Sequence, residues 1–226
     1  MNKPTVLAFV LAVSLSLTFA PAAVAGIPLR PAVVTPITDL IDVVIHNHDV
    51  IAIDASAGGG TRRTHLMVGE EVLWMGARGA MGLVVTDKRV LAITTEWGKW
   101  TAVHFKVHES RPYSVLLGDR VALVVTNYRA IGVSSSGRKP FQSLIGTKEK
   151  VVDGLVSDNV AVVATDRRVL GVSGFMPGIV ETRVGVHEDF EYASTLPNFV
   201  TIGTDDRVLV FRATTGAWAA ERVTLR

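Results

Sequence analysis

The sequence lacks cysteine altogether, and it has few charged residues (19%) and few aromatic residues (7%). Without cysteine the fold cannot depend on disulfides, and neither a thiolate nucleophile nor a cysteine-linked lipid is available. Convincing helical periodicity is also missing after residue 25. Because 48% of the residues are apolar, we expect the stability of the fold to come from an apolar core.

Charged residues of both signs are few. The chain has 23 Lys+Arg and 21 Asp+Glu, a formal net charge of +2, which gives no support to a nucleic-acid partner. The motifs G-x-S-x-G, Walker-type and H-E-x-x-H do not occur. We therefore expect no cofactor, and the sequence favours a protein that is not an enzyme.

The first residues form the pattern of a secretory signal peptide. A single cation, Lys3, precedes an apolar run at residues 6–19 and the small residues Ala23-Val24-Ala25. The run is short for a membrane span and is followed by a cleavage pattern. The sequence therefore predicts cleavage after Ala25 and a periplasmic or secreted protein without a spanning segment. Residues 26–37, which contain three prolines, are predicted to be an irregular lead-in.

A ten-residue pattern, V-V-T-D-K-R-V-L-A-I at residues 84–93, returns three times. Its threonines are Thr86, Thr126, Thr165 and Thr204, at steps of 40, 39 and 39 residues, and its arginines Arg89, Arg129, Arg168 and Arg207 repeat these steps. A period of about forty residues is typical of propeller blades.

Each copy is predicted to contain four strands, so the fold class is all-β. In the third copy they are residues 122–126, 129–134, 141–146 and 151–155, and the first of them is apolar at nearly every position. Such a strand is expected to be buried on both faces. Copies begin near residues 50, 82, 122, 161 and 200. The first is imperfect: we align Asp54 with the repeated threonine and Glu71 with Glu109, Glu149 and Glu188, which makes this copy six residues shorter.

These repeats resemble a five-bladed β-propeller over residues 38–226, with four-stranded blades of about 39 residues. The last copy ends before its fourth strand, while a surplus strand at residues 38–45 precedes the first copy. The resemblance implies that this N-terminal strand completes the last blade and closes a ring. The WD and G-H signatures of WD40 blades are absent, so no closer family is indicated. A β-sandwich with chance repeats is the alternative architecture.

The repeated Thr, Asp or Asn, and Arg fall at the turn after the first strand of each copy. We expect each arginine to pair with the glutamate of its own copy, Arg89 with Glu109, Arg129 with Glu149 and Arg168 with Glu188. Repetition in every copy favours a scaffold role, with exposed pairs contributing about 0–1 kcal/mol each. A ring of arginines that binds a polyanion is the alternative.

The loops at the other end of the strands differ between copies, and function tends to lie on variable loops above a rigid scaffold. They carry cations and large apolar groups. The candidate ligand-binding residues are Arg62, Arg63, Trp97, Lys99, Arg120, Arg138, Lys139 and Phe175. The sequence thus predicts an exported, non-catalytic binding module for a glycan, a peptide or a protein of the cell envelope.

Two further chemistries stay open. A hydrolase of envelope polysaccharide would use Asp54 with a loop acid such as Glu96 or Asp158. His46, His48 and Asp49 have the alternate spacing of a metal site, but H-x-H-D alone is weak evidence for one, and the sequence favours an ordinary polar turn. Trp100, Phe141 and Trp218 occupy similar places in their copies, which favours a role in blade packing over a ligand cage.

Overall fold

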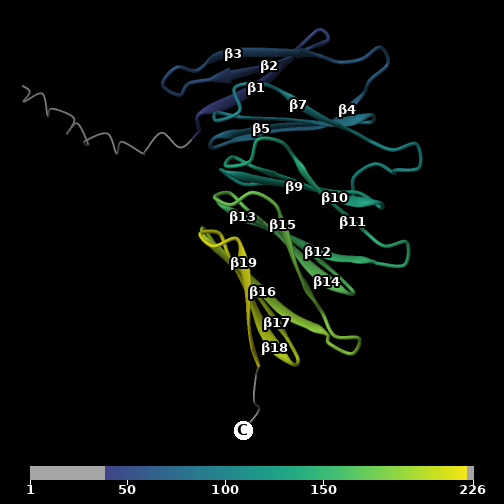
Figure 1. The fold of residues 1–226 in the computed structure, drawn as a ribbon. Helices are drawn as coiled ribbons and strands as arrows, with labels where there is room; N and C mark the ends of the chain where they lie inside the picture. The colour runs from purple at the N-terminus through teal and green to yellow at the C-terminus, as the bar shows by residue number, and fades with distance from the viewer. Residues whose placement is uncertain (1–38, 223–226) are drawn as a thin grey trace, which may run out of the picture. The chain divides into compact units, whose positions relative to one another are not determined.

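The computed structural model describes residues 39–222, which form five antiparallel sheets (Figure 1). The first sheet contains β1 (Ile41–His46), β2 (Asp49–Asp54) and β3 (Gly60–His65). The second contains β4 (Val72–Arg78), β5 (Met81–Thr86), β6 (Arg89–Thr94) and β7 (Thr101–His104). The third contains β8 (Ser114–Leu117), β9 (Val121–Val125), β10 (Arg129–Ser134) and β11 (Phe141–Leu144).

The two remaining sheets have the same order of strands. The fourth contains β12 (Val151–Val156), β13 (Val160–Thr165), β14 (Arg168–Ser173) and β15 (Ile179–Arg183). The fifth contains β16 (Phe190–Leu196), β17 (Phe199–Thr204), β18 (Arg207–Arg212) and β19 (Ala217–Arg222). Five sheets of successive antiparallel strands, one for each copy of the repeat, form a five-bladed β-propeller, and the predicted all-β fold class is confirmed.

The core lies between consecutive sheets. Every residue of β5, β6, β9, β10 and β13 is buried, because the two middle strands of a blade pack against a neighbouring sheet on each face. One cluster joins β9, β13 and β14 around Leu123 and Leu170, and another joins the fourth and fifth sheets around Phe211. The prediction of strands buried on both faces is confirmed.

The sheets divide the chain one strand earlier than the sequence suggested. In the third copy the first three predicted strands become β9, β10 and β11 of one sheet, but the fourth becomes β12, which pairs with β13. The sheet is completed on its other side by β8. Each connection from β7, β11 or β15 to the next strand is therefore a crossover between blades.

The alignment of the first copy was wrong. The backbone N–H groups of Ala55, Thr95 and Ser135 donate to Leu40 O, Ala80 O and Arg120 O, so residues forty apart make the same contact. Asp54 therefore corresponds to Thr94, and His46 corresponds to Thr86. The described part of the first sheet has three strands, and the positions forty residues before β4 lie outside the described residues.

The predicted role of the N-terminal strand was also wrong. The strand expected at residues 38–45 is β1, which pairs with β2 from Ile41↔Asp54 to His46↔Asp49. The fifth sheet instead obtains all four strands, β16 to β19, from its own part of the chain. Its first strand is the one that the sequence had assigned to the fourth copy.

The predicted signal peptide and its cleavage after Ala25, together with the lead-in at residues 26–37, lie outside the described residues. In the part that is described, no helix is long and apolar enough to cross a membrane.

Candidate functional site

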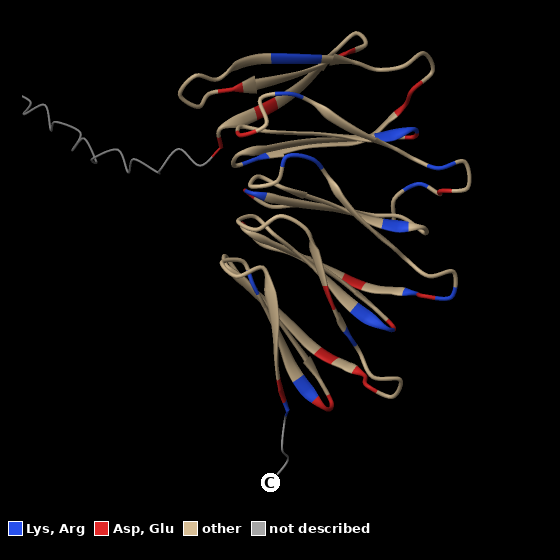
Figure 2. Ribbon diagram, viewed as in Figure 1, with Lys and Arg blue, Asp and Glu red and all other residues tan. Residues whose placement is uncertain are grey.

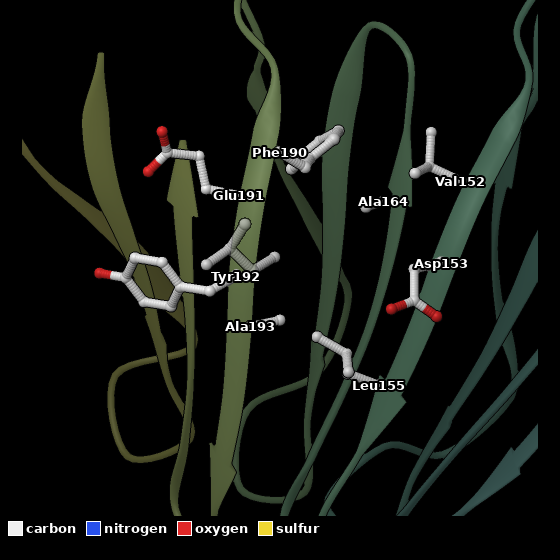
Figure 3. Close-up of a pocket in the computed structure, with 9 residues that line it drawn as sticks. Val152, Asp153, Leu155, Ala164, Phe190, Glu191, Tyr192 and Ala193 are labelled. Carbon is white, nitrogen blue, oxygen red and sulfur yellow. The ribbon is translucent and has the colours of Figure 1, made fainter. Parts of the chain in front are cut away.

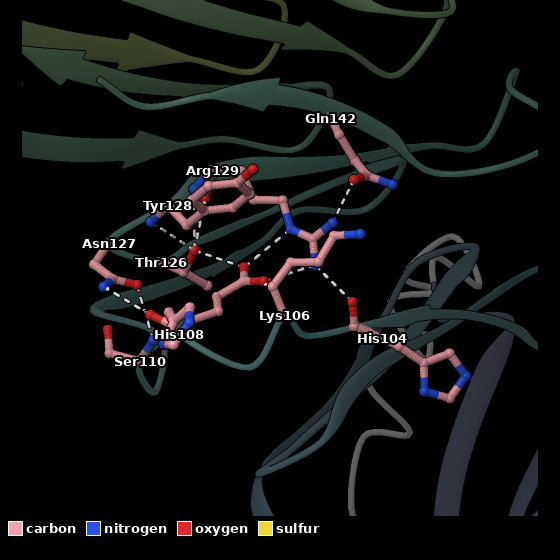
Figure 4. Close-up of polar contacts among 10 residues, drawn as sticks. His104, Lys106, His108, Ser110, Thr126, Asn127, Tyr128, Arg129 and Gln142 are labelled. Carbon is pink, nitrogen blue, oxygen red and sulfur yellow. Dashed lines mark hydrogen bonds and ion pairs between the residues drawn. The ribbon is translucent and has the colours of Figure 1, made fainter. Parts of the chain in front are cut away.

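The repeated Thr-x-x-Arg turns and the recurring glutamates form a clasp between consecutive sheets (Figure 4). Arg129, at the start of β10, donates from Nε to Glu109 Oε1 (2.9 Å) and from Nη2 to Glu109 Oε2 (2.8 Å). The same Nη2 donates to the carbonyl of His104 at the end of β7 (2.6 Å). Thr126 Oγ1 donates to Glu109 Oε1 (2.7 Å) and accepts from the backbone N–H of Arg129 (3.1 Å). One guanidinium thus ties the third sheet to the second.

The same clasp recurs at four junctions. The pairs are Arg89 with Glu70, Arg129 with Glu109, Arg168 with Glu149 and Arg207 with Glu188. The residue type of the partner was predicted correctly, but each arginine binds the glutamate of the preceding copy, so the predicted pairs Arg89–Glu109, Arg129–Glu149 and Arg168–Glu188 were wrong. In the first copy the clasping residue is Glu70, while Glu71 pairs with Arg111 at 3.2 Å.

The clasps are buried, in contrast to the exposed pairs that the sequence suggested. The side chains of Glu70 and Glu109 are 0% exposed, and that of Arg129 is 4% exposed. Burial by itself raises the pKa of Glu188, but hydrogen bonds from Arg207, the Gly185 backbone and Thr204 outweigh it and lower the pKa to about 2. The same balance, with burial opposed by Arg89 or Arg168, lowers the pKa of Glu70 and of Glu149. These carboxylates are held as anions.

The residue that directly follows the repeated threonine also binds at the junction, because its side chain accepts a backbone hydrogen bond from the connecting segment. Asp87 Oδ1 accepts from Glu71 N (2.8 Å), Asn127 Oδ1 from Ser110 N (2.8 Å), and Asp166 Oδ1 from Lys150 N (2.9 Å). Because the whole signature is used in contacts within the chain, the scaffold interpretation of the arginines is supported.

The divergent loops at the opposite end of the strands bring two of the candidate cations, Lys99 and Arg138, to one pocket. Lys99, on the β6–β7 loop, and Arg138, on the β10–β11 loop, line one pocket of about 400 Å³ with Trp97 and Glu96. Lys139 follows Arg138, and all three cations are exposed. None of the three has a carboxylate within ion-pair distance among residues 39–222.

Four other candidates hold these loops in place. Trp97 Nε1 donates to the carbonyl of Gly137, so the β6–β7 loop is fastened to the β10–β11 loop. Arg62 Nε donates to Gly98 O at 2.7 Å. Arg120 Nη2 pairs with Glu96 at 3.0 Å, and the Arg120 guanidinium lies 5.2 Å from the ring centre of Phe175. Sequence reasoning found these residues but could not see their contacts within the protein.

Arg63 and the metal candidates His46, His48 and Asp49 do not line this pocket. The turn His46-Asn47-His48-Asp49 joins β1 to β2, as the Thr-x-x-Arg turns join β5 to β6, and so belongs to the clasp end and not to the variable loops. Asp49 contacts His65 Nδ1 and lies 3.4 Å from Arg63 Nη1. No group of three or more potential metal ligands is found in the described part of the chain.

The three carboxylates proposed for a hydrolase each bind a different group. Asp54 Oδ1 accepts from Ser56 N (2.9 Å), Glu96 pairs with Arg120, and Asp158 pairs with Arg78 at 2.7 Å. Arg78 also binds Asp119 at 2.7 Å. Burial raises the pKa of Asp119, and although Arg78 opposes this, the nearby Asp158 and Asp39 reinforce it.

Two packing predictions are confirmed. Trp100 Nε1 donates to Arg62 O (3.1 Å), and Trp218 Nε1 donates to Val180 O (3.0 Å) while its ring lies 5.0 Å from that of Phe211. Both indoles therefore bind the last strand of the preceding sheet.

Sequence reasoning missed a shallow pocket of about 280 Å³ that lies between the first strands of the fourth and fifth sheets, β12 and β16 (Figure 3). Leu155, Phe190 and Ile202 form its apolar lining, and Asp153 and Glu191 are its acids. Nothing in the sequence marks it, because the pocket depends on how two separate strands are spaced.

No protein-family model and no curated protein matches the chain. Among solved structures, it is similar to yeast RCC1 (Prp20) bound to Kap60, with a TM-score of 0.40 and 10% identity over 76% of this chain and 54% of that chain. It is also similar to the N-terminal domain of Nup159, with a TM-score of 0.35 and 8% identity over 81% of this chain and 58% of that chain. YCF48 bound to D1 peptide gives a TM-score of 0.34 and 14% identity over 83% and 70%. The chain thus spans little more than half of the first two proteins, and the similarity is too low to indicate a shared ligand.

Proposed function

We propose that the protein is a non-catalytic, exported binding module that holds an acidic peptide segment of a partner protein on its variable loops. The observation that carries the proposal is the pair of exposed cations Lys99 and Arg138, which line a pocket of about 400 Å³ with Glu96 and Trp97, together with the exposed Lys139 that follows Arg138 in the chain. Cations without a carboxylate partner attract an anionic ligand, and the attraction is stronger beside a partly apolar wall.

The loops are held in position by the molecule itself. The bond from Trp97 to Gly137 O joins the two loops that carry the cations, and Arg62 supports the first of them through Gly98 O. A ligand would therefore meet cations whose backbone is already ordered, which lowers the entropic cost of binding. Trp97 provides an apolar surface beside Lys99 and Arg138 in the same pocket.

Catalysis finds less support in this arrangement. The carboxylates Asp54, Glu96 and Asp158 each have a different partner, as described above, and no two of them share one. Export and a location in the cell envelope remain part of the proposal and depend on the signal pattern at residues 1–25.

The test is a fluorescence-anisotropy titration with labelled acidic, neutral and basic peptides, at low and at high salt. The acidic peptides should bind, and the variant with Lys99→Glu, Arg138→Glu and Lys139→Glu should bind them about tenfold more weakly or worse. High salt should weaken binding to the unmodified protein in the same direction.

A matched control reverses three exposed lysines at the other end of the strands, with Lys106→Glu, Lys148→Glu and Lys150→Glu. This control has the same net charge as the first variant and should retain the affinity for acidic peptides. Equal losses in both variants would mean that only net charge matters. An unchanged affinity in the first variant would exclude this loop surface as the site.

A further inference from the structure

The turns that connect consecutive sheets expose aliphatic side chains at one repeated position. Val68, Val107 and Val186 are 95%, 96% and 95% exposed. The fourth member of the series is Thr147, also β-branched and exposed, and the steps from 68 to 107, 147 and 186 are 39, 40 and 39 residues. An isolated exposed valine needs no explanation, but an almost fully exposed one at the same place in three copies does.

These turns are rigid, and their shape directs the valines outward. In the second connection, Glu109 N donates to Lys106 O (2.9 Å) while Lys106 N donates to the Glu109 carboxylate (2.9 Å). The first turn, with Met67 and Glu70, and the last, with Gly185 and Glu188, are closed in the same two ways. The glutamate is also bound by the arginine of the next sheet, so each turn is anchored to the core. The valine is the second residue of the turn and points into solvent.

The four turn tips, which we define as Val68, Val107, Thr147 and Val186, face in a common direction. The same clasp joins each sheet to the next at all four junctions, and blades repeat radially about one axis in a propeller. Residues at one repeated position therefore lie at one height along that axis, that is, in one plane. Figure 1 shows the connections after β3, β7, β11 and β15 following one another along the same side of the sheets.

The polar groups around the second and third turn tips include three exposed lysines. Lys106, Lys148 and Lys150 are exposed and have no carboxylate within ion-pair distance in the range 39–222. The neighbouring acids are largely engaged: the four clasping glutamates bind arginines, and Asp87 and Asp166 accept backbone N–H groups. Figure 2 shows both signs of charge near these connections. In the fourth connection Asp189 N donates to Asp205 Oδ1 (3.0 Å), so two acids lie near the fourth tip, and the lysines are at the second and third tips.

We propose that the turn tips dock the protein on the surface of an anionic lipid membrane. A planar set of projecting aliphatic side chains flanked by lysines matches the two attractions that hold a protein at a bilayer interface, burial of apolar surface and attraction to anionic headgroups. None of the four tips lines either of the pockets described above. Docking at this end leaves Lys99, Arg138 and Lys139 facing away from the lipid.

The experiment is co-sedimentation of the folded protein with vesicles of phosphatidylcholine alone and of phosphatidylcholine mixed with phosphatidylglycerol. The protein should bind the anionic vesicles and bind the neutral ones much more weakly. The variant with Val68→Asp, Val107→Asp and Val186→Asp should lose at least about tenfold in vesicle affinity, because it removes the apolar contact and adds three negative charges. These side chains are exposed, so its thermal unfolding should match that of the unmodified protein.

The matched control has Thr61→Asp, Thr195→Asp and Thr214→Asp, the same change of charge at exposed positions away from the turn tips. It should bind anionic vesicles within a few-fold of the unmodified protein. A second variant, with each of the three valines changed to Ser, separates apolar contact from charge and should also bind more weakly. If the unmodified protein does not sediment with anionic vesicles, or if the valine variants sediment as it does, the proposal is wrong. Capture of a soluble protein by the turn tips without vesicle binding would overturn it equally.

Discussion

The glutamate side chains at the sheet junctions are almost fully buried, with exposures of 0% for Glu70 and Glu109 and 5% for Glu149 and Glu188. Glu109 accepts from Thr126 and from two nitrogens of Arg129, so its lone pairs are satisfied by groups that come from the next sheet. Removing one member of such a network leaves the other charged and unpaired in the interior, which costs far more than losing a surface ion pair.

We therefore expect Arg129→Ala to lower the free energy of unfolding by about 3–5 kcal/mol, because the buried Glu109 loses its cation. The matched control is Arg111→Ala. That arginine pairs with Glu71 at side-chain exposures of 68% and 66%, and its loss should cost less than about 1 kcal/mol. Urea unfolding followed by circular dichroism measures both, and equal losses would contradict the difference in burial.

The clasps also predict how stability depends on pH. The ordinary pKa of glutamate is 4.5, and that of Glu188 in the folded protein is lowered to about 2, so the unfolded chain binds protons that the folded chain does not. The contribution is fully present above about pH 4.5 and is lost as the pH falls towards 2. Urea unfolding at a series of pH values should show stability decreasing through this window, more steeply than in Glu188→Gln. A flat profile would mean that the clasps do not hold charged carboxylates.

The correct partners could not be chosen from the sequence. Glu70 and Arg89 are 19 residues apart, and Arg89 and Glu109 are 20 apart, so the glutamates before and after each arginine fit equally well. Burial of the strand ends and the crossover between sheets decide the pairing. The adjacent Glu70 and Glu71 presented a second ambiguity that only the fold of the connecting turn resolves.

At the scale of elements, the turn between the first two strands of each sheet touches the equivalent turn of the next sheet. Leu40 N donates to Gly79 O (2.7 Å), Ala80 N donates to Asp119 O (2.8 Å), and Arg120 N donates to Asp158 O (2.9 Å). Consecutive sheets are thus joined at both ends of their strands, by clasps at one end and by backbone bonds at the other.

Gly79 has little room in this contact. Its φ is +54°, and an added Cβ would lie 2.6 Å from the backbone of Asp119. Gly98 has a similar φ of +61° but nothing within 4 Å of an added Cβ. Gly98→Ala should cost about 1–2 kcal/mol from the backbone conformation alone, whereas Gly79→Ala should cost a further 1–3 kcal/mol or so from overpacking. Thermal unfolding of the two variants measures the difference, and similar melting temperatures would refute the close approach of the two turns.

The strands themselves were predictable, because Thr-x-x-Arg turns and doubly buried apolar runs mark β5, β9, β13 and β17. The boundary between sheets was not, since the strand before each run, such as β12, is as compatible with the preceding copy as with the next. In the first copy His46 and Asp49 replace the threonine and the arginine of the repeat. The sequence alignment therefore matched Asp54 to the threonine. As a result, the strand before Asp49 appeared not to belong to this copy.

At the scale of the whole molecule, the two ends of the strands have different characters. The clasp end is repetitive and carries the turn tips, while the loop end varies between sheets and carries Lys99, Arg138 and Lys139. Sequence divergence located the β6–β7 and β10–β11 loops, but it wrongly included the turn at His46–Asp49, which lies at the clasp end. It could not separate exposed cations from those engaged within the protein, such as Arg62 and Arg120, because their contacts join loops that are 36 and 24 residues apart in the sequence.

The central claim is that each sheet is fastened to the one before it through the arginine of the later copy and the glutamate of the earlier copy. Two double-mutant cycles on urea unfolding test it most directly, Arg129→Met with Glu109→Gln and Arg129→Met with Glu149→Gln. The first cycle should give a coupling energy of about 1–3 kcal/mol, and the second should be additive within about 0.5 kcal/mol. Strong coupling between Arg129 and Glu149, with additivity between Arg129 and Glu109, would contradict it.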